Sequence, residues 1–416
     1  MVRTLVCVVV LSSFLGQQSP SPDARVASVQ VKGIKRYTAE EVTRLSGVEI
    51  GQAATTADLT AAANRLAATG LFDTVRFTYT TNRAMAVTFE VTEAPWTVPV
   101  ILDNFVWLSD EQLTAALRVE VPSYDGTAPL NQGAADFIAH AIEKVMKARG
   151  IPGRIEFSPQ AVLGTREVKY LFTVKDPSPK LCALHFPGAT AIGEGDLSEP
   201  LKGAVGGDYS RFFISTAAEG TLTDMYRHKG FWRARFGTPT ASLDACQGVA
   251  VTVPVTEGVA YAWDRAEWSG TQALTADALN KALGMKAGDV ADGAKIDAGM
   301  RAVRQAYGTQ GYIAEQARVE PRLDDSTRRA VFAVSVEEGP QFHMGTLTFV
   351  GIRDSDAATL AKKWKLKPGD VYDESYESKY LREEIFPLQT SAGGRGYFEP
   401  QIDAERHIVN ARIVFK

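Results

Sequence analysis

Histidine is the residue type here that most often acts in catalysis or holds a metal, and the five histidines of the chain are spread far apart. They show no His-x-x-x-His pattern and no set of histidines and cysteines that would complete a zinc site. A single histidine is more often a surface or hydrogen-bonded core residue than a ligand. The sequence therefore predicts no metal site. The histidines are His140, His185, His228, His343 and His407.

Carboxylate pairs and glycine-rich stretches also fail to complete a catalytic arrangement. Glu40-Glu41 and Glu383-Glu384 fall in helical patterns, where charged residues usually face solvent. Gly206-Gly207-Asp208 and Gly393-Gly394-Arg395-Gly396 lack the strand-loop-helix context of a phosphate-binding loop, and there is no Gly-x-Ser-x-Gly sequence. No nucleophile, base and orienting group can be assembled. We therefore expect a non-enzyme without a cofactor or a small-molecule substrate; a hydrolase or ligand-binding protein is the weaker alternative.

Charge and cysteine content narrow the class of protein further. The net charge of −4 and the pI near 5.9 give no basic patch for nucleic acid, so no nucleic-acid partner is expected. A short basic start, an apolar run over 5–15 and a polar stretch to Pro22 are typical of a cleaved export signal. The alternative is a buried N-terminal strand.

Export would leave two cysteines, Cys182 and Cys246. A pair of cysteines in one exported domain favours a disulfide, and two separate buried thiols remain the alternative.

A glycine followed by an aromatic or aliphatic residue recurs five times, at intervals of about 80 residues. Helices often end on a left-handed glycine whose apolar successor folds back on the last turn. The first instance is the clearest, because Gly70 ends an alanine-rich helical pattern and the alternating strand 73–80 follows. The five pairs are Gly70-Leu71, Gly150-Ile151, Gly230-Phe231, Gly311-Tyr312 and Gly396-Tyr397.

The elements around these glycines repeat in the order strand, helix, helix, strand, strand. In the first unit the strand 26–32 precedes a helix that Thr38 and Glu41 would open as a capping box. A second helix over 56–68 and the strands 73–80 and 85–91 complete the unit. We expect 1–24 to be signal peptide and linker, followed by five domains that we call repeats 1 to 5. Their predicted bounds are 25–95, 96–178, 179–258, 259–341 and 342–416.

This element order, the glycine stop and a strand ending in Val-x-Glu resemble the POTRA (polypeptide-transport-associated) domain. The closing phrases are Val91-Thr92-Glu93, Val255-Thr256-Glu257-Gly258 and Val336-Glu337-Glu338-Gly339. The resemblance implies an α+β fold of five tandem β-α-α-β-β domains in an elongated array. Each domain would be a three-stranded sheet in the order first-third-second, covered by two helices. The resemblance is weaker in repeats 2 and 3, where Asn104 takes the place of the glycine after the first strand of repeat 2.

Five such domains after a signal peptide resemble the periplasmic arm of BamA-type outer-membrane assembly proteins. The resemblance implies a periplasmic, outer-membrane-associated scaffold that binds unfolded outer-membrane proteins or assembly partners. The family's membrane barrel would follow the array, whereas this sequence stops at the last strand of repeat 5. We therefore expect an arm that works beside a separate outer-membrane β-barrel, or a truncated relative. The alternative function is a spacer or docking arm that does not bind clients.

The second strand of each repeat would be a sheet edge, and edges with unpaired backbone groups can accept another strand. Prolines are expected to interrupt or end that strand in four repeats, at Pro159, Pro239, Pro321 and Pro400. Repeat 1 has no such proline, which favours β-augmentation along its second strand. Proline at Arg76 or Thr78 is expected to abolish peptide cross-linking to this strand while repeat 1 stays folded. The alternative is an edge guarded by Arg76 and by crowding from repeat 2. The expected partner-binding residues are Thr74, Val75, Arg76, Phe77, Thr78 and Tyr79.

Overall fold

The computed structural model describes residues 25–80, 84–162, 165–244, 248–387 and 396–415. The predicted export signal, Cys7 and Cys246 lie outside these residues. The chain forms two compact units, which are described separately. The first contains residues up to 187, 194–217 and 238–254, and the second contains 188–193, 218–237 and 255–416. The boundary between the units passes through repeat 3.

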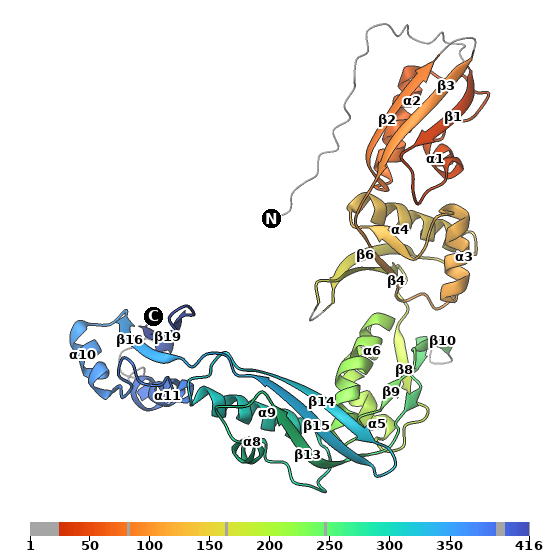
Figure 1. Cartoon of the computed structure of the whole chain (residues 1–416). Coiled ribbons are helices and arrows are strands. Elements are labelled where there is room, and N and C mark those ends of the chain that lie inside the picture. The colour runs from red at the N-terminus through yellow and green to blue at the C-terminus, as the bar shows by residue number, and fades with distance from the viewer. Residues whose placement is uncertain (1–24, 81–83, 163–164, 245–247, 388–395, 416) are drawn as a thin grey trace. The chain divides into compact units, whose positions relative to one another are not determined.

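Repeat 1 has the predicted element order (Figure 1). Thr55 and Asp58 make a complete capping box at the start of the second helix. At the first helix, by contrast, only the Thr38 side chain accepts the Glu41 N–H, so the capping box predicted there is half formed. The Glu41 carboxylate instead accepts a hydrogen bond from Ser123 of repeat 2, at 3.0 Å. The elements are β1 Val26–Lys32, α1 Ala39–Ser46, α2 Thr56–Ala68, β2 Phe72–Thr80 and β3 Met85–Glu93.

Repeat 2 keeps this order with one addition. The inserted turn at Tyr124-Asp125-Gly126 leads into a short strand that pairs with the first strand of the repeat. The helices begin at Ser109 and Asn131, whose side chains accept backbone N–H groups of the first turn. The elements are β4 Thr97–Leu102, α3 Asp110–Glu120, β5 Thr127–Pro129, α4 Gln132–Lys147, β6 Arg154–Ala161 and β7 Val168–Lys175.

Repeat 3 departs most from the prediction. The helical segment over 211–228 contains a π-helical turn, and the second and third strands are each divided into two short strands. In the first unit lie β8 Leu181–His185, α5 Glu194–Ser198, the 3₁₀ segment Glu199–Ala204, α6 Arg211–Ala217, β10 Thr240–Asp244 and β11 Gly248–Thr252. In the second unit lie the π turn Ala218–Leu222, α7 Thr223–His228, β9 Arg235–Phe236 and β12 Val255–Thr256.

Repeats 4 and 5 return to the regular order within the second unit. Repeat 4 contains β13 Ala262–Ser269, α8 Ala276–Leu283, α9 Gly293–Gly308, β14 Gln316–Asp324 and β15 Arg329–Glu337. Repeat 5 contains β16 His343–Val350, α10 Asp354–Lys363, α11 Glu374–Tyr380 with a π turn Leu381–Ile385, β17 Gly396–Phe398, β18 Gln401–Asp403 and β19 Ile408–Phe415. The fold is thus mixed α+β, as predicted.

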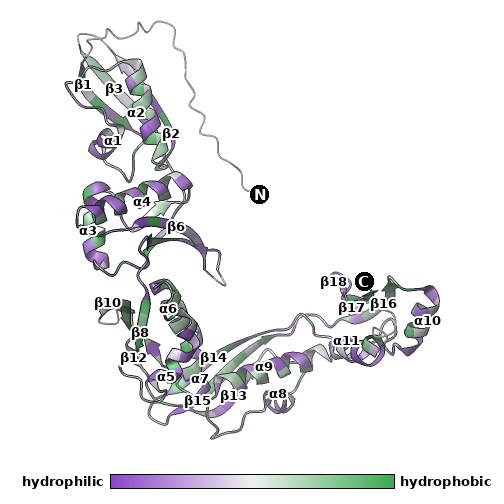
Figure 2. Ribbon diagram, turned by 180° about the vertical axis from the view of Figure 1, so that it is seen from behind, coloured by the Kyte–Doolittle hydropathy of each residue, from purple (hydrophilic) through white to green (hydrophobic). Residues whose placement is uncertain are grey.

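The sheets confirm the strand order first-third-second. In repeat 1 the order is β1-β3-β2, with β1 parallel and β2 antiparallel to the central strand. The same arrangement holds for β13-β15-β14 and for β16-β19-β17, and in repeat 2 for β4-β7-β6 with β5 added outside β4. Helices such as α2 and α4 show separate hydrophobic and hydrophilic stripes (Figure 2), and the apolar stripe enters the core.

Four of the five recurrent glycines end a helix in the left-handed conformation, as predicted. Gly70, Gly150, Gly230 and Gly311 have φ values between 66° and 83°. Gly396 differs, because it is the buried first residue of β17 and is not among the positive-φ glycines. A side chain there would meet Ile385 and Phe415, so close packing explains this glycine.

In four of the five repeats, a glycine shortly after the first strand packs against the third strand. A Cβ atom on Gly33, Gly188, Gly270 or Gly351 would lie 2.0–2.3 Å from a carbonyl oxygen near the end of the third strand. In repeat 2 the side chain of Asn104 takes this place, with hydrogen bonds to both the N–H and the C=O of Val174. The weaker resemblance of repeat 2 at this point therefore reflects a substitute that makes the same connection.

Candidate functional site at the edge of the first sheet

Strand β2 forms one edge of the sheet in repeat 1. In the described part of the chain β3 is its only strand neighbour. Thr74, Arg76 and Thr78 are exposed, whereas Val75 and Phe77 are partly buried and Tyr79 is buried. The structure therefore brings all six predicted partner-binding residues together on one edge strand, with the two predicted faces.

The exposed face of this sheet is polar. Register places Glu90 of β3 between Arg76 of β2 and Lys32 of β1, and it places Thr88 opposite Thr78. Opposite charges on neighbouring strands attract one another, so Arg76 has a compensating neighbour on the face of the sheet. Such a polar face is a poor site for an apolar ligand, which makes the backbone edge the stronger candidate for binding.

The sequence reasoning missed that β1 is the other edge of the sheet. The loop after α1 covers the start of this edge, because the Val26 N–H donates to Gln52 O at 2.9 Å and the Gly51 N–H donates to Val26 O at 2.7 Å. The corresponding loops pair in the same way with Leu181, Trp263 and Met344, and Val100 bonds to Gly126. The sequence signal for this covered edge was the recurring glycine-containing turn between the two helices.

Three of the four edge-strand prolines occupy corresponding positions, and the fourth lies nearby. Pro159 pairs with Tyr170, and Pro321 pairs with Phe332. Each partner lies four residues before the third-strand residue that the glycine or asparagine after the first strand contacts, namely Val174 and Val336. Pro400 falls opposite Ala411 by the same count, and Pro239 falls two register pairs away, opposite Val253. Tyr79, opposite Val87, holds this position in repeat 1.

These prolines do not all act as predicted. Strands β6 and β14 continue through Pro159 and Pro321, so the prediction that proline interrupts or ends the strand is wrong there. Pro400 lies between β17 and β18, and Pro239 lies between β9 and β10, so these two prolines interrupt the strand as predicted. A strand can continue through proline at a sheet edge because the missing N–H faces outward. The outer edge of each strand therefore lacks one donor.

The same register shows which amides of β2 face outward. Next to Pro400, the Glu399 N–H bonds inward to Arg412 O at 2.8 Å, so inward and outward donors alternate along the strand. Transferred to β2, this alternation points the N–H groups of Val75 and Phe77 outward and those of Arg76 and Thr78 toward β3. Proline at Arg76 or Thr78 would therefore disrupt the sheet itself, which corrects the expectation stated above.

Repeat 2 contacts the chain just before β2. Asn131 Nδ2 donates to Gly70 O at 2.8 Å, and a Cβ on Gly70 would lie 2.2 Å from the Ala134 nitrogen. Gly133 packs in the same way on Ala68. These contacts fall on 68–70, ahead of the first strand residue, Phe72. Crowding from repeat 2 thus acts at the start of the edge.

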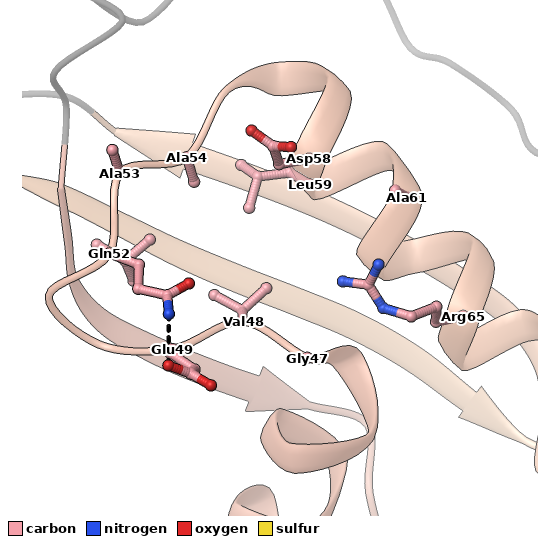
Figure 3. Close-up of a pocket in the computed structure, with 11 residues that line it drawn as sticks. Gly47, Val48, Glu49, Gln52, Ala53, Ala54, Asp58, Leu59, Ala61 and Arg65 are labelled. Atoms are coloured by element: carbon pink, nitrogen blue, oxygen red, sulfur yellow. Dashed lines mark hydrogen bonds between the residues drawn. The ribbon is translucent and has the colours of Figure 1, made fainter.

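A hollow of about 200 Å³ in repeat 1 lies between α2 and the loop after α1 (Figure 3). Arg65 Nε donates to Ser46 O at 2.8 Å, and Gln52 Nε2 donates to Glu49 at 2.5 Å. Small-molecule sites usually exceed about 300 Å³ and contain polar groups available to the ligand. These two hydrogen bonds hold the loop after α1 in place, so the polar groups of the hollow have a structural role.

Glu257, whose pKa is strongly shifted, also has structural partners. Burial opposes ionisation of Glu257, but hydrogen bonds from Thr190, Tyr226 and Ala191 lower its pKa to about 2. This glutamate belongs to the closing Val-x-Glu phrase and holds the loop after the first strand. In the described residues no group of three or more potential metal ligands occurs, and none of the helices there is long and apolar enough to cross a membrane.

Cys182 forms a disulfide. The predicted partner, Cys246, lies outside the described residues, but two residues later a Cβ on Gly248 would lie 3.2 Å from Cys182 Sγ. We propose that Cys182 and Cys246 are bonded. Alkylation of the oxidised protein without reductant is expected to add no label at either cysteine in intact-mass spectra, and a protein that gains two labels there would contradict the pairing.

Comparison with known proteins agrees with the element order. The family model described as POTRA, surface antigen variable number repeat, matches residues 24–94 and 261–339. A putative outer membrane protein assembly factor of Treponema pallidum is 25% identical over 56% of this chain and 29% of its own length. The outer membrane protein assembly factor BamA of Neisseria meningitidis is 21% identical over 85% of this chain and 45% of its own length. The chain therefore spans less than half the length of these relatives.

Among solved structures, the chain is similar to POTRA domains 3–5 of Haemophilus influenzae BamA, with 18% identity, a TM-score of 0.41, and coverage of 57% of this chain and 96% of that one. POTRA domains 1–3 of Omp85 from Anabaena match with 15% identity and a TM-score of 0.27, over 57% of this chain and 95% of that one.

Proposed function

Because this chain contains POTRA domains and is similar to BamA-type outer-membrane assembly proteins, we propose that it is a non-enzymatic periplasmic scaffold for extended polypeptides. Its clients are unfolded outer-membrane proteins or assembly partners, and an outer-membrane β-barrel protein is a further partner. The binding mode is β-augmentation on β2, in which main-chain hydrogen bonds give affinity with little sequence preference.

One observation carries this proposal, namely the difference between β2 and the other second strands. Proline stands at the position of Tyr79 in repeats 2, 4 and 5, and two register pairs away in repeat 3. Each proline removes an outward donor, which is a common way to protect an exposed edge. Strand β2 contains no proline, so no ring blocks the approach of another backbone along this edge, and the edge is suited to accept a strand.

A second function, a spacer or docking arm that does not bind clients, is favoured by the contacts between repeats 1 and 2. Arg36 forms an ion pair with Asp125 at 3.0 Å, Arg44 donates to Glu120 O, and Ser123 donates to the buried Glu41. These bonds limit rotation between the two repeats. A fixed arrangement suits an arm that holds a partner at a set distance, but it does not require the open edge of β2.

The two functions differ in their effect on an unfolded client. If the chain binds clients, the mature protein in equimolar amount is expected to slow aggregation of a urea-diluted outer-membrane protein at least about twofold, as followed by light scattering. The slowing of aggregation should reach a plateau as the concentration of the mature protein is increased, because each edge binds a fixed number of client strands. An unchanged aggregation rate at tenfold excess would contradict client binding and favour the spacer.

A further inference from the structure

Trp96 and Leu130 form an exposed apolar pair beside the first sheet. Trp96 is 78% exposed and Leu130 is 45% exposed, which is unusual for side chains of this size. Trp96 directly precedes β4 and Leu130 directly follows β5, and Thr97 pairs with Pro129 in this antiparallel ladder. The Leu130 N–H donates to Trp96 O at 2.8 Å. The two residues are therefore opposite one another, with their side chains on the same side of the ribbon.

The two residues adjoin residues that bond to the chain just before β2. Just before this strand, the Leu71 carbonyl accepts the Ala94 N–H at 3.0 Å, on the side of β3. The preceding carbonyl, that of Gly70, accepts from Asn131 Nδ2 instead. Leu130 is the neighbour of Asn131 and the cross-strand partner of Trp96. Both residues are therefore within two residues of a hydrogen bond to 70–71, near the Phe72 end of β2.

We propose that Trp96 and Leu130 anchor the polypeptide that pairs with β2. The partner class is an extended segment that carries a large aromatic or aliphatic side chain at the end of the paired stretch. This inference rests on the proposed function, because the backbone of β2 supplies the pairing. Scattered exposed apolar residues are common on protein surfaces. Here two of them face each other at the end of an unpaired edge, where main-chain bonds hold a strand but do not select its sequence.

The length of the edge determines the ligand used in the test. Residues 73–80 span about 27 Å, at about 3.4 Å for each residue, so a paired segment has roughly eight residues. We would use fluorescein-labelled ten-residue peptides of alternating Thr and Val, with Phe at the first position, with Phe at the last position, or with Ser at both. Comparison of the two Phe peptides identifies the direction in which the added strand runs.

Fluorescence anisotropy with the mature chain is expected to show about fivefold to tenfold tighter binding of one Phe peptide than of the Ser peptide, because the ring is removed from water. Trp96→Ala is expected to abolish this preference and leave binding of the Ser peptide unchanged. Ile50→Ala is the matched control, since Ile50 is 68% exposed in repeat 1 but lies on the loop that covers β1. It is expected to retain the preference.

The outcomes separate the anchor from the proposed function. If the peptides bind and photo-cross-link to β2 while Trp96→Ala keeps the preference for Phe, the anchor is wrong and β-augmentation stands. A preference lost equally in Ile50→Ala would also reject the anchor, because the effect would not be local. If none of the peptides cross-links to β2 in the parent chain, both the proposed function and the anchor are overturned. Hydrogen exchange of β2 in each variant verifies that repeat 1 is folded.

Discussion

Val75→Pro is expected to reduce cross-linking of an extended peptide to β2 at least about tenfold while repeat 1 stays folded. The Val75 N–H points to the outer edge by the register argument, so proline removes a donor that an added strand would use. A hydrogen bond contributes about 1 kcal/mol, and the ring also blocks close approach of the incoming backbone. Together these effects exceed the 1.4 kcal/mol that corresponds to a factor of ten.

Two variants make this test specific. Val75→Ala removes the same partly buried side chain but keeps the N–H, so it is expected to retain cross-linking. Arg76→Pro removes a donor that faces β3, so it is expected to destabilise the β2–β3 ladder and to raise hydrogen exchange over 72–93. The readout is the yield from a benzophenone side chain at exposed Thr74, introduced into every variant. Equal yields for Val75→Pro and Val75→Ala would show that the outer edge is not the binding surface.

The sequence predicted regular elements well where the local pattern was complete. The strand 26–32 and the helix 56–68 have the predicted bounds, because alternation, the Thr55 cap and the stripe of Leu59 and Leu66 agree with one another. The glycine stops at Gly70 and Gly311 are confirmed for the same reason. The strand order was available only through the family resemblance, since pairing depends on contacts distant in sequence.

Other features depend on tertiary packing and could not be derived from local patterns. Glu41 has the spacing of a capping box, but its carboxylate turns to Ser123 of the next repeat. In repeat 3 the long helical pattern contains a π turn at Ala218–Leu222, which no local signal marks. The role of the edge prolines depends on register, and register cannot be read from one strand. For the same reason, the sequence could not show that the Arg76 amide faces β3.

In four of the five repeats, the contact between the glycine after the first strand and the third strand is a point of expected sensitivity to substitution. In repeat 1 this residue is Gly33, with φ +87° and a missing Cβ that would lie 2.0 Å from Val91 O. The oxygen belongs to the central strand and cannot move without disturbing two ladders. Asn104 shows that a side chain is tolerated at this point only where the backbone has another geometry, which lets its amide bond to Val174.

Gly33→Ala is therefore expected to destabilise repeat 1 by about 3 kcal/mol or more. The left-handed conformation costs an alanine about 1–2 kcal/mol, and displacement of the central strand adds the remainder. A domain of this size has a total stability of only about 4–10 kcal/mol, so a large fraction of it is lost. Hydrogen exchange over 26–32 and 85–93 is expected to rise sharply, while β14 and β15 of repeat 4 stay protected.

Gly51→Ala separates the two contributions to this loss. Gly51 has φ +92°, nearly the same as Gly33, but a Cβ there would meet nothing within 4 Å. It is expected to lose only the conformational part, about 1–2 kcal/mol, and repeat 1 should stay folded. Equal exchange rates in the two variants would show that backbone conformation alone makes Gly33 necessary. Faster hydrogen exchange in Gly33→Ala than in Gly51→Ala would show that the close approach of β3 to Gly33 causes the additional loss of stability. The edge strand β2 depends on this packing because it pairs with β3.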